Sequence, residues 1–444
     1  MCPQLNTMLK HPLVDGCLQS VLGTDYYVHL HRHPHMRDNV DKGPPGKVHG
    51  LHKDSMYNSR FGVDAKRRQH RIRMCMLMYF PQDTPVELGP TAIMPKSHYL
   101  LHSPPGGVDT VPYEPDAKAI HLAGPAGTVG IVAYDMLHTS TNKALLNRRH
   151  MIKFLFSRMT EPSVSGPSWA STGTPWQAGD NMQEPIWRAQ YDWHCGRPEK
   201  PSWDDDAAAQ GSIKDLATQL HSHNEMEAVR ASYTLGVTGG VAGRKELMTA
   251  LKRLPAQNIK EEELASKFDE ADATVQAAYG LVEQGAAAVP SLMELACSDE
   301  PVLRARAMDI LGDIGPQAAD ALPMLLKAAQ DDQAEDPRRR AVEAIGTVGC
   351  GVPHQAALCV SLAARLADSS PQVRRNAAYS IARLAPALRD APVVQSQLVV
   401  SALARTLTDS TEFGRGFSAL ALERIGTEGS LKAALAHLQT TRFD

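Results

Sequence analysis

The chain has 444 residues, long enough for two or three domains, and its content of 43% hydrophobic and 21% charged residues is ordinary for a soluble protein. Its formal net charge of −3 argues against a nucleic-acid binder that works through bulk positive charge. The seven cysteines form no Cys-x-x-Cys pair, which argues against a zinc ribbon and favours a reducing compartment. Without an apolar run of 18 residues or an N-terminal signal, we expect a soluble, cytoplasmic protein with no membrane span.

Short strand-like runs fill the first 160 residues. The segments 74–80, 128–134 and 151–156 are apolar, and Pro and Gly occur between them. Short strands bounded by turn residues indicate a β-sandwich or a jelly-roll barrel.

Four alternating histidines, at positions 29, 31, 33 and 35, would share one face of a strand. A second metal site is one interpretation of them. An exposed polar edge is the favoured one, because Pro34 interrupts the strand.

The pair His52 and Asp54 is the most informative local motif. A histidine and a carboxylate two residues apart on a strand edge can reach the same metal ion. His138 follows 84 positions after Asp54 and can complete a set of two histidines and one carboxylate with open coordination positions. This ligand set is typical of non-haem Fe(II) oxygenases.

Two consecutive arginines, Arg148 and Arg149, follow His138 by ten and eleven positions. A guanidinium binds a carboxylate through two parallel hydrogen bonds, which fixes its orientation as well as its charge. An arginine at this distance is what an oxygenase needs to hold the far carboxylate of 2-oxoglutarate.

Further motifs lie in a fixed order between and after these residues. They are a Gly-Pro-x-x-x-x-Pro-x-Ser-His turn at 89–98, the stretch 127–130, Asp135 to His138, Ser140 and Asn142. With them, residues from about 10 to 158 resemble the phytanoyl-CoA dioxygenase family. The resemblance implies a double-stranded β-helix (jelly roll) and an Fe(II)/2-oxoglutarate-dependent dioxygenase that consumes O2.

The resemblance also implies roles for individual residues. His52, Asp54 and His138 would bind iron. Arg149 has the commonest family spacing and is the preferred 2-oxoglutarate anchor, Arg148 is the fallback, and Ser140 matches a position that often assists the same carboxylate. Halogenating relatives replace the carboxylate ligand by a small residue, so the intact Asp54 favours hydroxylation. His98 is expected to have a structural role and not to act as a base.

The position of the His-x-Asp pair departs from the family pattern. Family members usually carry another helix and strand before the region that begins here at Met1. We therefore expect an N-terminally short dioxygenase domain at residues 1–160.

Residues 161–211 form a connecting segment rich in Trp and Pro that contains all five tryptophans of the chain. A flexible tether would rarely carry so many large aromatic side chains, which bury much area when they pack. We expect this segment to pack against one or both domains.

Residues 212–440 are rich in Ala and Leu and repeat themselves. The segments 302–315, 337–349 and 373–385 are similar, and aligning Gly312, Gly346 and Ala382 gives spacings of 34 and 36 residues. These periods are typical of helical solenoids, and the region resembles HEAT-like repeats in five or six units. Small residues would let helices approach closely, and the repeated arginines would bridge to an Asp of a neighbouring repeat.

The predicted chain is therefore a multidomain α and β protein, a jelly-roll dioxygenase domain followed by an all-α solenoid. Its favoured function is hydroxylation of a C–H bond in a small-molecule or acyl-type substrate, with release of succinate and CO2. An alternative is a hydroxylase directed to a protein or carrier, with the solenoid as the recognition surface for a protein partner. A non-catalytic scaffold is the weaker alternative, and nucleic acid is not an expected partner.

Overall fold

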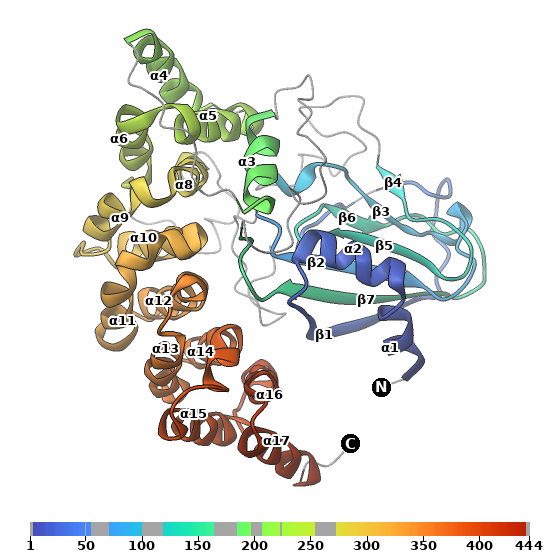
Figure 1. Cartoon of the computed structure of the whole chain (residues 1–444). Helices are drawn as coiled ribbons and strands as arrows, with labels where there is room; N and C mark the ends of the chain where they lie inside the picture. The colour runs from blue at the N-terminus through green and yellow to red at the C-terminus, as the bar shows by residue number, and fades with distance from the viewer. Residues whose placement is uncertain are drawn as a thin grey trace. The chain divides into compact units, whose positions relative to one another are not determined.

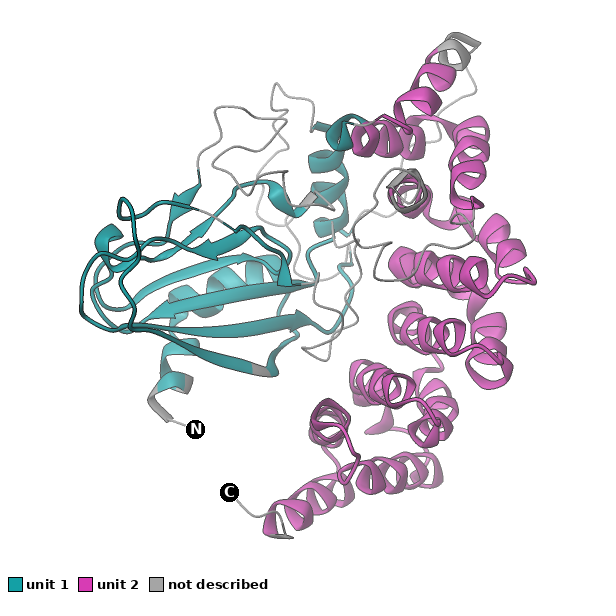
Figure 2. Cartoon of the chain, turned by 180° about the vertical axis from the view of Figure 1, so that it is seen from behind, with its two compact units in different colours: residues 1–197, 224–227 teal, residues 198–223, 228–444 magenta. Residues whose placement is uncertain are grey.

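The computed structural model describes residues 3–48, 50–54, 71–99, 119–163, 184–196, 207–222, 224–253 and 272–440 (Figure 1). The chain divides into two compact units, each taken by itself below (Figure 2). Unit 1 comprises residues 1–197 and 224–227, and unit 2 comprises residues 198–223 and 228–444. Among the described residues, no helix is both long enough and apolar enough to cross a membrane.

Unit 1 begins with two helices, α1 (Pro3–Leu9) and α2 (Pro12–Leu22), and continues into a four-stranded sheet. Its strands lie in the order β1 (Tyr26–Arg37), β7 (Arg149–Arg158), β2 (Met74–Phe80) and β5 (Thr128–Ala133). All neighbouring strands are antiparallel. The strands predicted at 74–80, 128–134 and 151–156 are confirmed.

A second, three-stranded antiparallel sheet has the order β4 (Ile120–His121), β3 (Thr91–Ile93) and β6 (His138–Ser140). Two short 3-10 turns, η2 (Val86–Leu88) and η3 (Ser97–Tyr99), flank β3. Unit 1 is thus a two-sheet β domain, and closure of these strands into a complete jelly roll stays a prediction.

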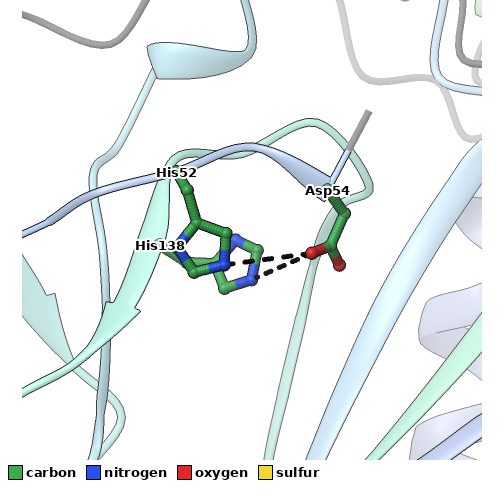
Figure 3. A group of neighbouring side chains, drawn as sticks. All are labelled: His52, Asp54 and His138. Carbon is green, nitrogen blue, oxygen red and sulfur yellow. Dashed lines mark ion pairs between the residues drawn. The ribbon is translucent and has the colours of Figure 1, made fainter. Parts of the chain in front are cut away.

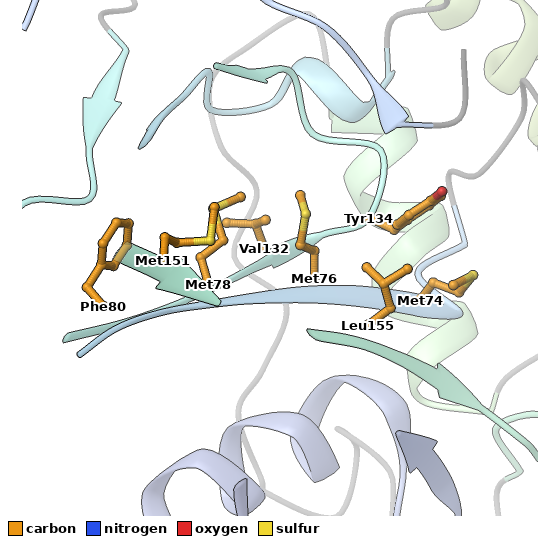
Figure 4. Packing of buried hydrophobic residues seen from close by; sticks show 8 residues of the cluster. All are labelled: Met74, Met76, Met78, Phe80, Val132, Tyr134, Met151 and Leu155. Atoms are coloured by element: carbon orange, nitrogen blue, oxygen red, sulfur yellow. The ribbon is translucent and has the colours of Figure 1, made fainter. Parts of the chain in front are cut away.

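The four-stranded sheet is buried on both faces because its central strand alternates two sets of apolar side chains. Cys75 and Leu77 pack with Leu18 and Leu22 of α2. The opposite face carries a cluster that Ile93, Leu122 and Met136 cover from the side of the second sheet. Figure 4 shows this cluster, which consists of Met74, Met76, Met78, Phe80, Val132, Tyr134, Met151 and Leu155. A strand buried on both sides reads as a continuous apolar run, as residues 74–80 do.

Helix α3 (Glu184–His194) contains two of the five tryptophans and packs within unit 1. The guanidinium carbons of Arg71, Arg73 and Arg158 lie 5.9, 5.4 and 5.2 Å from the Trp193 ring centroid. The Lys96 ammonium lies 5.2 Å from the ring of Trp187. These cation–π contacts confirm a packing role for both rings, whereas Trp169, Trp176 and Trp203 lie outside the described residues.

The described part of unit 2 is helical. Its α-helices are α4 (Ala207–Gln219), α5 (Glu225–Thr238), whose first residues belong to unit 1, α6 (Gly240–Leu251), α8 (Asp272–Gln284), α9 (Val289–Leu295), α10 (Pro301–Ile314), α11 (Leu322–Asp331), α12 (Glu335–Val348), α13 (Gln355–Ala363), α14 (Pro371–Leu384), α15 (Val393–Thr406), α16 (Glu412–Ile425) and α17 (Glu428–Thr440). Helix α12 packs between α10 and α14, and α14 packs between α12 and α16. This stacking of successive helical pairs confirms the solenoid.

Small residues set the close approach of these helices. A Cβ atom added to Gly312 would lie 3.1 Å from Ala344, and one added to Gly346 would lie 2.4 Å from Ser380 Oγ. The contact at Gly312 is tight, and the one at Gly346 is too short for a real side chain without a shift of its neighbour. The aligned small residues of the repeats are therefore the contact points between successive helices.

A series of arginine–aspartate bridges joins successive repeats. Arg304 lies 2.7 Å from Asp332, Arg338 lies 3.2 Å from Asp368, and Arg374 lies 2.6 Å from Asp409. Each of these arginines also donates to two backbone carbonyls just before its own helix. The predicted bridging role of the repeated arginines is confirmed.

Candidate metal centre

A backbone bridge brings the two predicted histidine ligands together. The amide of His52 donates to the carbonyl of His138 at 3.1 Å, and the amide of His138 donates to the carbonyl of His52 at 3.0 Å. Two antiparallel residues that exchange both hydrogen bonds stand directly opposite each other, with their side chains on the same face. The two imidazole rings accordingly lie with their centroids 4.5 Å apart.

The carboxylate of Asp54 faces both rings (Figure 3). Its Oδ1 atom is 3.9 Å from Nε2 of His52 and 3.8 Å from Nε2 of His138. One ligand atom from each of the three residues lies within 4.8 Å of the other two. In the part of the chain that the structure describes, this is the one group of three such side chains close enough to share a metal ion.

The surroundings of His138 leave its Nε2 atom able to bind a metal ion. Nδ1 lies 2.9 Å from the carbonyl oxygen of Met136, a partner that can only accept, so Nδ1 carries the proton and Nε2 a lone pair. Burial lowers the pKa of His138 to about 4, and the positive charge of Lys153 acts in the same direction. The imidazole is therefore neutral at physiological pH, which is the form that binds a metal.

Asp54 is held in its charged form. Burial raises the pKa of this carboxyl group, but the charge of Lys153, that of His138 and the hydrogen bond from Lys153 outweigh burial and leave the pKa below its usual value. Two imidazoles and one carboxylate form a donor set that fits a divalent transition-metal ion.

Lys153 also belongs to this candidate site, although none of the sequence motifs includes it. Its Nζ donates to Asp54 Oδ2 at 2.9 Å and lies 3.4 Å from Nε2 of His138. The signal that points to it is strand alternation, because Lys153 is four residues after Arg149 on the same strand and so faces the same side.

Arg149, the preferred 2-oxoglutarate anchor, is the first residue of β7 and is only 3% exposed. Its Nε and Nη1 atoms are buried without a hydrogen-bond partner among the described residues. Burial, aided by the charge of Arg37, lowers its pKa to about 10, so it stays charged at neutral pH. A buried guanidinium with free donors fits a carboxylate ligand, because leaving such a group without a partner is costly.

Arg148, the fallback anchor, lies on the surface. Its side chain is 55% exposed, and its Nε and Nη2 atoms donate to the two carboxylate oxygens of Asp38 at 2.5 and 3.0 Å. It already has an acidic partner, whereas Arg149 has none in the described part of the chain. The contrast favours Arg149 as the carboxylate-binding residue.

The remaining predicted residues lie around the same strands. Ser140 ends β6 two positions after His138, so its side chain is on the same face of the strand as His138. Asn142 is buried, and its Nδ2 donates to the carbonyls of Lys42 and Pro44, a loop-fixing role. His98 is partly buried, and desolvation of its ring lowers its pKa to about 3, which agrees with a structural role.

The alternating histidines of β1 form no three-residue metal cluster among the side chains described. His33 and His35 stack with centroids 4.4 Å apart, and His29 is buried. The side chain of His31 lies outside the described residues.

With this geometry in view, residues 3–150 match the family model of phytanoyl-CoA dioxygenase (PhyH). Residues 262–346 match the family model of HEAT repeats. The chain thus contains a PhyH domain followed by HEAT repeats, and the predicted resemblance is confirmed. No curated protein matches the chain significantly.

Solved structures of both kinds resemble parts of the chain. The non-heme alpha ketoglutarate dependent epimerase SnoN from nogalamycin biosynthesis is 18% identical over 36% of this chain and 57% of its own, with a TM-score of 0.27. The non-heme monooxygenase ThoJ, solved as a nickel complex, is 16% identical over 42% and 70%, with a TM-score of 0.24. A computationally designed armadillo repeat protein for modular peptide recognition is 19% identical over 50% and 94%, with a TM-score of 0.33.

Proposed function

We propose that unit 1 is an Fe(II)/2-oxoglutarate-dependent dioxygenase that hydroxylates a C–H bond of a small organic or acyl-type substrate, releasing succinate and CO2. The observation that carries this proposal is the combination of two features in one domain. One is the cluster of His52, Asp54 and His138, and the other is the buried Arg149, whose Nε and Nη1 atoms have no partner among the described residues. The PhyH match over residues 3–150 supports the same class of activity.

The roles of the residues follow from their chemistry. His52 Nε2, Asp54 Oδ1 and His138 Nε2 would hold Fe(II) and leave its other positions open to the co-substrates. The bound iron, with O2 and 2-oxoglutarate, would supply the oxidising chemistry. Arg149 would bind the far carboxylate of 2-oxoglutarate bidentately, assisted by the Ser140 hydroxyl. The apolar Met/Phe cluster on the inner face of the sheet would limit access of water.

The proposal also includes the domain boundaries and the fold of unit 1. We place the dioxygenase domain at residues 1–160, the connecting segment at 161–211 and the HEAT-like repeats at 212–440. The two antiparallel sheets of unit 1 support a double-stranded β-helix, the fold that the family resemblance implies. Asp54 supplies the carboxylate that a hydroxylating centre keeps.

A second candidate is a hydroxylase directed to a protein or carrier-bound group. The HEAT repeats favour it, because stacked helical repeats present extended surfaces that proteins use for binding. A non-catalytic scaffold is favoured by one observation only, the Lys153 ammonium close to two of the three ligands.

A succinate-release screen tests the proposal. The full chain would be incubated with Fe(II), 2-oxoglutarate and separate pools of small acids, acyl-CoAs, amino acids and cell-extract proteins. We expect substrate-dependent succinate with one small-molecule or acyl pool and none from the His138→Ala variant. Stimulation by the protein pool alone would favour the second candidate, and equal succinate from wild type and His138→Ala would contradict the proposed centre.

A further inference from the structure

Lys153 lies on the inner face of the four-stranded sheet, between two other strands. It pairs with His33 of β1 on one side and with Met78 of β2 on the other. The residue is 5% exposed, and its ammonium reaches two of the three ligand side chains. A buried lysine in this place is a fixed positive charge at the edge of the candidate metal centre.

The two oxygens of Asp54 have different partners. Oδ1 faces the Nε2 atoms of both histidines, at 3.9 and 3.8 Å. Oδ2 accepts a hydrogen bond from Lys153 at 2.9 Å, its sole partner in the described part of the chain. Lys153 therefore fixes the carboxylate so that one oxygen points to the histidines while the other is engaged elsewhere.

We propose that Lys153 is a positioning residue of the metal centre, which keeps Asp54 a one-oxygen ligand and weakens metal binding through its own positive charge. This inference rests on the proposed function. An ion bound to Nε2 of His138 must lie close to the Lys153 ammonium, because Nζ is 3.4 Å from that nitrogen. Two positive charges repel each other strongly where little water screens them.

The hydrogen bond and the charge of Lys153 have separate consequences. Without the hydrogen bond, Oδ2 becomes free to bind the same ion as Oδ1, which would occupy a position that 2-oxoglutarate needs. Without the charge, the repulsion is lost and the ion binds more tightly. Removal of Lys153 thus strengthens metal binding and weakens co-substrate binding, two opposite changes that general loosening of the site would not produce.

Calorimetric titration of the metal-free full chain with Co(II), and then of the Co(II)-loaded chain with 2-oxoglutarate, tests both consequences. Lys153→Met removes the charge and the hydrogen bond, whereas Lys153→Gln removes the charge and keeps a donor for Oδ2. We expect both variants to bind Co(II) about tenfold or more tightly than wild type. We expect Lys153→Met alone to bind 2-oxoglutarate about tenfold more weakly, and its Co(II) visible spectrum to change with the coordination.

Lys143→Met is the matched control, because Lys143 is another buried lysine of unit 1 and donates to the carbonyls of Asp38 and Leu145. It should leave Co(II) affinity unchanged. Unchanged or weaker Co(II) binding in both Lys153 variants would overturn the inference while the metal centre stands. Equal 2-oxoglutarate binding by the Met and Gln variants would overturn the role in orienting Asp54. A wild-type chain that takes up no Co(II) would overturn the proposed function together with the inference.

Discussion

The two units use arginine in opposite ways. In unit 2, Arg304, Arg338 and Arg374 each meet an aspartate of the next repeat and two backbone carbonyls. In unit 1, Arg149 is only 3% exposed, less than the side chains of these three arginines at 14–18%, yet its Nε and Nη1 atoms have no partner in the described part of the chain. Buried polar groups normally have hydrogen-bond partners. A buried charged side chain without one therefore indicates a ligand site, whereas the paired arginines of the repeats indicate a structural role.

Removal of a histidine ligand should have the largest effect. His138→Ala leaves one imidazole and one carboxylate, which cannot hold a labile divalent ion well. We expect metal uptake and succinate release to fall together to background, measured by metal analysis after gel filtration and by product assay. His98→Ala is the control at a partly buried histidine outside the cluster. A His138→Ala chain with full turnover would refute the ligand assignment.

The contrast between Arg149 and Arg148 gives the next largest effect. Arg149→Leu should weaken 2-oxoglutarate binding by about 2–5 kcal/mol, because the co-substrate carboxylate loses a charged bidentate partner in a buried site. Metal affinity should stay nearly unchanged. Arg148→Leu, which removes an exposed side chain paired with Asp38, should have little effect on either measurement. The reverse result, with Arg148→Leu the damaging variant, would show that the anchor is one residue earlier.

In the solenoid, removal of a bridging arginine should affect stability alone. Arg338→Ala loses the pair with Asp368 and the bonds to two carbonyls, and should cost about 1–3 kcal/mol in unfolding free energy. Urea unfolding followed by circular dichroism measures this change. Lys327→Ala, which removes an exposed pair with Asp331, should change stability by less than about 1 kcal/mol. Loss of metal binding in Arg338→Ala would contradict a purely structural role for the arginines of the repeats.

A smaller effect should appear in the pH dependence of solenoid stability. Burial raises the pKa of Asp368, but the hydrogen bonds from Arg338 and from the Ser370 amide outweigh it and leave the pKa below its usual value. Because the folded pKa is lowered, this contribution to stability is fully present above about pH 4 and is lost as the pH falls through the folded value. Between pH 5 and pH 3, the unfolding free energy of Asp368→Asn should therefore fall less than that of wild type. The difference should correspond to the titration of about one carboxyl group. An identical acid dependence of the two proteins would contradict the lowered pKa.

Several parts of this molecule could be predicted from the sequence because local patterns determine them. The strand at 74–80 is apolar on both faces, and the small residues at 312 and 346 recur with the helical repeat. The three candidate ligands can be predicted because a His-x-Asp pair and a distant histidine occur within a larger ordered motif.

Other features depend on contacts between distant segments. Lys153 has no motif of its own, and only the pairing of β7 with its neighbours and the position of Asp54 bring its ammonium to the site. The choice between Arg148 and Arg149 likewise depends on which of two adjacent residues begins β7. A shift of one residue in a strand reverses the faces of all its side chains, so spacing alone could not decide it.

Anaerobic titration of the metal-free full chain with Fe(II), followed by 2-oxoglutarate, shows most directly whether His52, Asp54 and His138 form an iron centre that binds 2-oxoglutarate. We expect one Fe(II) per chain, 2-oxoglutarate binding that requires this iron, and a visible absorption band that appears only when both are present. His138→Ala should show neither the iron uptake nor the band. If 2-oxoglutarate bound equally well without iron, or if wild type and His138→Ala took up the same amount of iron, the proposed metal centre would be contradicted.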